Sequence, residues 1–310
     1  MVEQQLIEFN QLALARPSLR KHRDMYNRVM TRDNIALLAR LEMLDVVGVN
    51  QQLLPNGHHP EIVIGNVHIH WDPTFKDVKL VQAIMLAEEV EKFLGLGNSN
   101  GKANNQGNKG LVLCGDFNSL PESGVLQFLT GGGIGPRHAD FMQHTYEPYS
   151  TEGAKHRLQL SNAFDGLMEG GLLPVTNFTP GFSGVIDHIL YRPGSLALTG
   201  VLGGIPAGYL KQLVGFPTQH QPSDHLSLMA EFRVEGVSPT PPGFLHMPSQ
   251  QQQQVNVNKR PLTGSQPVAN GPVRFGAPIV QIPTAGNQTT TRISPQQSLQ
   301  NQKNPNKNNI

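Results

Sequence analysis

The pattern of hydrophobic positions in the first 235 residues changes repeatedly between the period of a strand and the period of a helix. Short apolar or alternating runs predict strands at 34–47, 61–70, 110–115, 184–191, 196–202 and 225–234. Helical spacing predicts helices at 2–16, 77–96, 123–129 and 207–214. In the first helix Phe9 and Ala13 share a face with two leucines, and Asp77 is a suitable N-cap for the second. Strands interleaved with helices predict the α/β class.

The composition changes sharply after Glu235. No acidic residue, Trp or Tyr follows it, and the chain becomes rich in Pro, Gln and Asn, with a glutamine homopolymer at 250–254. Such a segment buries too little apolar surface to offset the entropy of ordering it. We therefore predict a folded domain at 1–237 and a disordered tail at 238–310. The apolar stretch 273–282 is interpreted as a linker, with a short partner motif as the alternative.

Charge also differs between the two parts. The tail holds six of the 24 basic residues, which leaves 18 basic against 23 acidic residues in the domain, a net charge of about −5. A domain of this charge does not bind long nucleic acid by polyelectrolyte attraction. If its substrate is a nucleic acid, the domain should hold only a few nucleotides and neutralise their phosphates with metal ions.

The cellular compartment follows from cysteine usage and hydropathy. Cys114 is the only cysteine, so a disulfide within the chain is excluded and a reducing compartment is favoured. No signal peptide and no apolar run of membrane-spanning length is present, so we expect no membrane partner. We expect a cytoplasmic protein, with the nucleus as a second location.

Polar residues directly follow the apolar strand at 110–115. Asp116 and Asn118 lie on one side of the chain if the strand stays extended. The carboxylate can bind Mg²⁺ or position a water, and the amide can hold a phosphate oxygen without repelling it. A turn that ends the strand is the alternative, because Asp and Asn favour turns.

Two further strands carry acidic or imidazole groups. Asp187 interrupts the apolar stretch 184–191, and a buried carboxylate is costly unless it is paired or binds a metal. A functional role is favoured over a structural hydrogen bond. Asp224 and His225 precede another apolar run, and a carboxylate beside an imidazole can fix its tautomer. Adjacent strand residues face opposite ways, so Asp224 alternatively orients a loop.

Two histidines, His68 and His70, alternate at the end of the strand at 61–70. A zinc pair would need further ligands, and none is near in sequence. We predict that one contacts phosphate and the other packs. His188 points away from Asp187 and is expected to pack or to lie at the surface.

The order Asn66-x-His68, Asp116-x-Asn118, Gly184-x-x-Asp187 and Ser223-Asp224-His225 resembles the endonuclease/exonuclease/phosphatase superfamily. The intervening sequence is similar to the carbon catabolite repressor type of poly(A) deadenylase. Segments with this similarity are 27–35, 68–73, 77–82, 111–114, 118–121 and 176–179. The resemblance covers about residues 4 to 235.

This resemblance implies an α/β sandwich that removes adenylate from mRNA tails in the 3′-to-5′ direction. AMP would be released with the help of two Mg²⁺ ions. Poly(A) RNA would be the substrate, and the partners would be the scaffold and other subunits of the mRNA deadenylation complex. The family's catalytic positions fall on His68, Asp116, Asn118, Asp187 and His225. Its metal positions fall on Asp116, Asp187 and His225, and its adenine-recognition positions on Pro73, Asn177 and Phe182.

The resemblance also assigns roles to these residues. Asp116 would align the attacking water, and His68 and Asn118 would hold phosphate oxygens. His225, with Asp187, would stabilise the transition state. Phe182 would stack on adenine and Asn177 would hydrogen-bond the edge of the base.

The family's catalytic domain begins before the segment that matches Val2. Its first strands, an asparagine near the phosphate and the glutamate that is a principal Mg²⁺ ligand correspond to sequence upstream. We therefore expect open strand edges and one open side of the core. Two alternatives remain: an inactive fragment that acts as a binding module, or another phosphodiesterase of the superfamily, which would not need Asn177 with Phe182.

Overall fold

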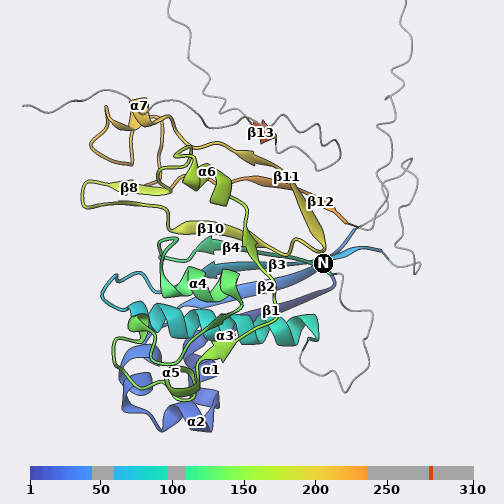
Figure 1. The fold of residues 1–310 in the computed structure, drawn as a ribbon, viewed down its shortest axis with the longest axis vertical. Coiled ribbons are helices and arrows are strands. Elements are labelled where there is room, and N and C mark those ends of the chain that lie inside the picture. Colours follow the sequence, from blue (N-terminus) through green and yellow to red (C-terminus); the bar gives the residue numbers. More distant parts are fainter. Residues whose placement is uncertain (44–58, 97–108, 236–278, 282–310) are drawn as a thin grey trace, which may run out of the picture.

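A computed structural model describes residues 1–43, 59–96, 109–235 and 279–281, and these residues form an α/β fold (Figure 1). Residues 44–58 and 97–108 and most of the predicted tail lie outside the described residues. None of the described helices is long and apolar enough to cross a membrane.

The main sheet has six strands in the order β1-β2-β3-β4-β10-β7. Neighbouring strands are antiparallel except β3 and β4, which are parallel. Their bounds are β1 Glu3–Glu8, β2 Ile35–Glu42, β3 Glu61–His68, β4 Gly110–Asp116, β7 Ser161–Asn162 and β10 Asp187–Tyr191. The carboxyl ends of β3 and β4 and the start of β10 therefore meet at one edge of the sheet.

Smaller sheets complete the β structure. One has the order β12-β11-β13, and the others are the pairs β5-β6 and β8-β9. Their bounds are β5 Gly133–Ile134, β6 Ala154–Lys155, β8 Asn177–Thr179, β9 Phe182–Gly184, β11 Leu196–Leu202, β12 Ala230–Val234 and β13 Ile279–Gln281.

The helices gather mainly on one face of the main sheet (Figure 1). Their bounds are α1 Phe9–Ala15, α2 Pro17–Arg20, η1 Met25–Val29, α3 Lys76–Leu94, α4 Gly124–Gly131, η3 Ala139–Phe141, α5 Tyr149–Glu152, α6 Asp165–Glu169 and α7 Ala207–Leu210. The helix α3 is buried on almost all sides, and its apolar residues form the core with Leu38, Val63 and Leu113 of the sheet.

The predicted helix at 2–16 is wrong for its first half. Residues Glu3–Glu8 form β1, which pairs with β2, and only Phe9–Ala15 is helical. Glutamate and glutamine are good helix formers, but the backbone groups of β1 bond to β2, and Leu6 and Ile7 point to opposite faces. Pairing with a distant strand therefore overrides the local preference.

Other predicted elements are confirmed with shorter bounds. The strand predicted at 61–70 ends at His68, and β11 matches its predicted range. The strand predicted at 225–234 begins only at Ala230. Helix α3 starts at Lys76, with Phe75 as its N-cap residue, so Asp77 lies inside the first turn and is not the cap.

The face of the main sheet opposite α3 is only partly covered. Ile189 and Tyr191 of β10 pack against the second sheet, where Tyr191 meets Phe232 at 5.0 Å between ring centroids. Towards β1 the same face is exposed: Leu6 and Leu37, which are register partners, are 56% and 45% accessible. Apolar side chains at this end of the sheet are therefore accessible to solvent.

Within the predicted disordered tail, one short segment is described. Ile279–Gln281 forms β13, antiparallel to Gly200–Leu202 of β11. The prediction of a linker is therefore wrong for these three residues. The physical reason is that β11 has an edge with unpaired backbone groups, and an apolar extended segment can bond to it.

Candidate active site

A tight turn at the end of β4 holds Asp116 and Asn118 together. The Asn118 backbone N–H donates to Asp116 Oδ1 at 2.7 Å, and its side-chain amide donates to Asp116 Oδ2 at 3.1 Å. Asn118 has φ 46°, a left-handed conformation that asparagine tolerates. The strand does not stay extended, so the turn that the sequence offered as an alternative is present. It nevertheless places both polar groups side by side.

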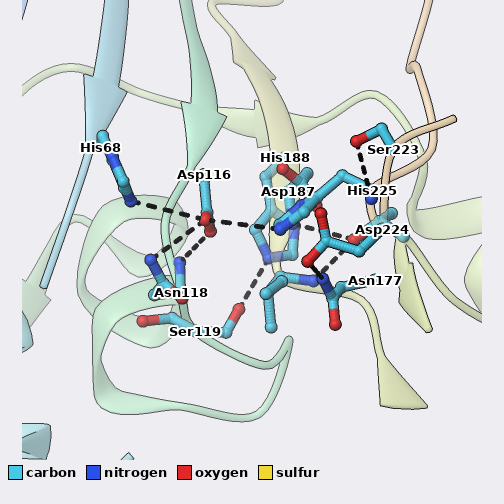
Figure 2. A network of polar contacts seen from close by, with 12 residues as sticks. His68, Asp116, Asn118, Ser119, Asn177, Asp187, His188, Ser223, Asp224 and His225 are labelled. Atoms are coloured by element: carbon cyan, nitrogen blue, oxygen red, sulfur yellow. Dashed lines mark hydrogen bonds and ion pairs between the residues drawn. The ribbon is translucent and has the colours of Figure 1, made fainter. Parts of the chain in front are cut away.

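The next strand in the sheet contributes Asp187, which is the register partner of Asp116. Asp187 Oδ2 accepts a hydrogen bond from His225 Nδ1 at 2.8 Å (Figure 2). Since Nδ1 carries the proton of that bond, the other ring nitrogen, Nε2, is left for the site, 4.0 Å from Asp116 Oδ2. The backbone of Asp187 is itself held by Thr176 Oγ1, which accepts its N–H at 3.1 Å.

His68 closes the other side of this arrangement. It is the register partner of Asp116 on β3, and its Nε2 lies 3.8 Å from Asp116 Oδ2 (Figure 2). The side chain is 65% exposed, so it is available to a ligand. His70 is 4% exposed and packs against Phe75. The prediction that one of these histidines packs is confirmed for His70, and phosphate contact by His68 stays a prediction.

Asp116, Asp187 and His225 form a group that can hold a metal ion. Each offers one ligand atom, and these atoms all lie within 4.8 Å of one another. Two carboxylates and an imidazole at partly exposed positions fit a divalent cation, and carboxylate oxygens are the ligands that Mg²⁺ prefers. The three predicted metal residues are therefore brought together by the fold.

The charges in this cluster depend on one another. Burial raises the pKa of Asp116, and the charge of Asp187 raises it further. The hydrogen bond from the Asn118 N–H opposes this rise without cancelling it. Burial alone would lower the pKa of His225, but its hydrogen bond to Asp187 and the nearby carboxylate charges raise it overall. A protonated His225 can donate from Nε2 to an anionic oxygen. A cation between the carboxylates would relieve their repulsion.

Of the remaining predicted residues, Asn177 contacts the cluster. Asn177 is 6% exposed, forms an isolated bridge with His225, and donates its side-chain amide to Asp224 Oδ2 at 3.3 Å. Asp224 thus orients a neighbouring segment, as the alternative interpretation held. Phe182, at the start of β9, is 40% exposed, and Pro73 lies in the exposed turn before α3.

His188 is a buried packing residue and is not at the surface. It is 1% exposed, its ring nitrogens bond to the Ser119 carbonyl oxygen at 2.8 Å and to Asn162 at 3.1 Å, and its ring meets Phe117 edge-on.

Two residues of α3 that the sequence analysis missed support the turns at the site. Lys79 Nζ donates to the Asn118 carbonyl oxygen at 2.7 Å, and Gln82 Oε1 accepts the His70 backbone N–H at 2.9 Å. Both are buried, and they lie three positions apart on one side of the helix. The available indication was two polar residues at helical spacing within the apolar run 78–87. They hold the turns that follow β3 and β4.

The burial of Lys79 predicts an unusual dependence of stability on pH. Burial lowers the pKa of Lys79 to about 8, below its unfolded value of 10.5. Between these values the unfolded chain binds more protons than the folded one, so stability rises with pH through this window. Replacing Lys79 with methionine should remove this rise. At pH 7 it should also reduce the free-energy cost of burying the charged ammonium, by on the order of 2 kcal/mol. Urea unfolding followed by circular dichroism from pH 7 to 10.5 measures it.

Lys92→Met is the matched control, because Lys92 is on the same helix but its side chain is 61% exposed. The control should keep the rise of wild type. An unchanged slope in Lys79→Met would show that this lysine is not the group responsible.

Comparison with known families agrees with this geometry. Residues 4–225 match the model of the Endonuclease/Exonuclease/phosphatase family. The chain belongs to this family. The expected α/β fold of this family is confirmed, because a six-stranded sheet with helices packed on it accompanies the family match.

Relatives narrow the placement within the endonuclease/exonuclease/phosphatase family. The "CCR4-Not complex 3′-5′-exoribonuclease subunit Ccr4" of Mycosarcoma maydis is 44% identical over 80% of this chain and 38% of its own length. The protein with the same name in Schizosaccharomyces pombe is 40% identical over 76% of this chain and 34% of its own. The "CCR4-NOT transcription complex subunit 6-like" of Danio rerio is 36% identical over 80% of this chain and 46% of its own length. The chain thus spans less than half the length of these relatives.

A solved structure shows the same fold. The crystal structure of ANGEL2, described as a 2′,3′-cyclic phosphatase, in complex with adenosine-2′,3′-vanadate, aligns with a TM-score of 0.55 at 23% identity. The alignment covers 76% of this chain and 67% of that one. This similarity concerns the fold alone.

Proposed function

We propose that this protein is a 3′-to-5′ exoribonuclease that shortens the poly(A) tails of mRNA and releases AMP. The observation that carries the proposal is the convergence of Asp116, Asp187 and His225 within 4.8 Å, with His68 and Asn118 beside them. The relatives, named as 3′-5′-exoribonucleases, support this choice of reaction.

Magnesium is the proposed cofactor, with two ions in the working site. Asp116 and Asp187 would provide the carboxylate ligands and His225 would lie close to the second ion. When bound, Mg²⁺ would compensate phosphate charge and favour deprotonation of the attacking water. Because Mg²⁺ is usually held by few carboxylates together with substrate phosphates, we expect its binding to strengthen when RNA is present.

The protein's own groups would act on the phosphate as follows. Asp116 would accept a hydrogen bond from the attacking water and align it with the phosphorus. His68 would donate to a non-bridging phosphate oxygen. The Asn118 amide would donate to another by giving up one of its bonds, to Asp116 Oδ2 or to the Ile69 carbonyl oxygen. His225, protonated and oriented by Asp187, would donate from Nε2 to an oxygen whose negative charge grows in the transition state.

Adenine preference would come from the hairpin of β8 and β9. Phe182 is exposed enough to stack on a base, although stacking alone tolerates any base. The Asn177 amide provides hydrogen bonds that can select adenine, on condition that it exchanges or shares its bond to Asp224. Pro73 would contact the base from the opposite turn.

The relatives are named as subunits of the CCR4-Not complex, and we propose that this protein joins the corresponding deadenylation complex through its scaffold and other subunits. We place it in the cytoplasm, with the nucleus as a second location.

The proposal predicts selective shortening of A20 RNA. In a protein that also carries the family's upstream glutamate, A20 should be shortened one nucleotide at a time in Mg²⁺ with release of AMP, whereas U20 should remain intact. EDTA should stop the reaction. Denaturing gels of 5′-labelled RNA and chromatography of the nucleotide product measure both results. Equal cutting of A20 and U20 would contradict the adenine pocket. Binding of A20 without any cleavage would favour the binding module.

A further inference from the structure

The single tryptophan of the chain, Trp71, is exposed beside the candidate active site. Its side chain is 68% accessible, whereas an indole usually buries most of its surface. Trp71 follows His68 by three residues, so their Cα atoms are at most about 11 Å apart. The packing of the core does not explain this position.

The backbone around Trp71 is held firmly although the indole is exposed. Ile69 N–H donates to the Asp116 carbonyl oxygen at 3.0 Å, and His70 N–H donates to Gln82. On the other side, Asp72 accepts from the Thr74 N–H at 2.8 Å and from its hydroxyl at 2.7 Å. The indole also lies against the buried His70 ring, at 6.2 Å between centroids. Little conformational entropy is therefore left to lose when a ligand stacks on it.

Two exposed aromatic side chains flank the cluster from different strands. Trp71 follows β3, and Phe182 belongs to the hairpin whose other strand bridges His225. The strands β3, β4 and β10 are neighbours in the sheet, so β3 and β10 are about 10 Å apart, and Phe182 precedes the first residue of β10 by five positions. An extended single strand that has one base on Phe182 would cross the cluster and continue towards β3.

A cation, Arg32, is connected to Trp71 through the contacting rings of Phe75 and His70. The Arg32 guanidinium lies over the Phe75 ring at 4.5 Å, and the same ring meets His70 at 5.2 Å. Within the part of the chain that the structure describes, Arg32 Nε and His70 Nε2 have no hydrogen-bond partner. Burial and the charge of Arg32 lower the pKa of His70, so Arg32 is the cation of this group at neutral pH. An anionic backbone that passes the indole would meet this charge.

We propose that Trp71 is a stacking platform for a second base of the RNA strand, on the side of the catalytic cluster away from Phe182, with Arg32 attracting the adjoining phosphate. The inference rests on the proposed function and adds a substrate contact to it. Stacking does not discriminate between bases, so this contact would contribute affinity and not adenine preference.

Because Trp71 is the only tryptophan, its own fluorescence reports on the contact. The whole chain carrying Asp116→Asn, which prevents cleavage, is titrated with fluorescein-labelled A10 RNA to measure anisotropy, and separately with unlabelled A10 to measure tryptophan emission. RNA should quench the Trp71 emission, and the midpoint of the quenching curve should equal the midpoint of the anisotropy curve. Trp71→Ala in the same background should weaken binding about tenfold. In the active protein, Trp71→Ala should raise KM by a similar factor and leave kcat unchanged.

A matched reporter tests whether quenching is local. Met43 is 45% exposed and follows β2 at the end where Glu42 pairs with Glu61, the end of the sheet opposite His68. In Trp71→Phe with Met43→Trp, A10 should still bind but the emission should stay constant.

Saturation of anisotropy with unchanged Trp71 emission would overturn the inference while leaving the exoribonuclease proposal intact. Equal quenching of the Met43→Trp reporter would overturn it as well. If A10 is neither bound nor shortened by the active protein, the proposed function fails and the inference fails with it.

Discussion

Replacing Asp116 with asparagine should reduce A20 shortening by about a hundredfold to a thousandfold. Asp116 Oδ2 is the atom at which the site converges, 3.8 Å from His68 and 4.0 Å from His225. Asparagine keeps an oxygen that can accept the Asn118 N–H but removes the charge that faces the metal and the water. Losing one preorganised electrostatic contact to a transition state costs about 3 to 4 kcal/mol.

Single-turnover cleavage of A20 at saturating Mg²⁺ measures this loss. Asp165→Asn is the control, since Asp165 is an exposed carboxylate on α6 that lies outside the cluster. The control should cleave at the wild-type rate, and both variants should unfold at the wild-type urea midpoint. Turnover by Asp116→Asn within tenfold of wild type would remove this carboxylate from the mechanism.

The elements predicted correctly are those in which burial and local pattern agree. The runs that became β3, β4 and β11 are rich in Val, Ile and Leu, and α3 is a long apolar segment. Here the sequence alone is sufficient, because strand and helix lengths differ and each run is bounded by turn residues. The failure at β1 is different in kind. Its pattern fits either structure, and pairing with β2 decides the outcome.

The members of the site could be predicted, but not the way in which they meet. Strand ends with Asp, Asn and His indicate candidates one by one. Their convergence depends on register: His68 opposite Asp116, and Asp116 opposite Asp187. Spacing along the chain does not contain this register. The same reason explains why Lys79 was missed, since its partner is a backbone carbonyl in a turn that only the fold brings to the helix.

Asp77 was incorrectly predicted to be an N-cap, and its replacement is expected to have the largest effect on stability. Asp77 is fully buried, and its carboxylate accepts two hydrogen bonds from Arg28, at 2.6 and 2.8 Å, and one from the Tyr146 hydroxyl. The bonds join η1 and the segment before α5 to the first turn of α3, so the carboxylate stabilises tertiary packing more than the helix end. Burial opposes ionisation, but these donors lower the pKa of Asp77 overall.

Asp77→Ala should therefore reduce the free energy of unfolding by about 3 to 5 kcal/mol, because it leaves the Arg28 charge and the Tyr146 hydroxyl without their acceptor. Urea unfolding at pH 7 measures the loss.

Arg28→Met in the same chain provides the test of mechanism. If the loss comes from an uncompensated charge, the double variant should be more stable than the sum of the single losses predicts. Additive losses, or a loss below about 1 kcal/mol for Asp77→Ala, would show that the ion pair is not what holds η1 against α3. Asp77→Ala should lower A20 shortening only through the folded fraction, since the side-chain partners of Asp77 among the described residues are Arg28, Tyr146 and His144, which lie outside the catalytic cluster.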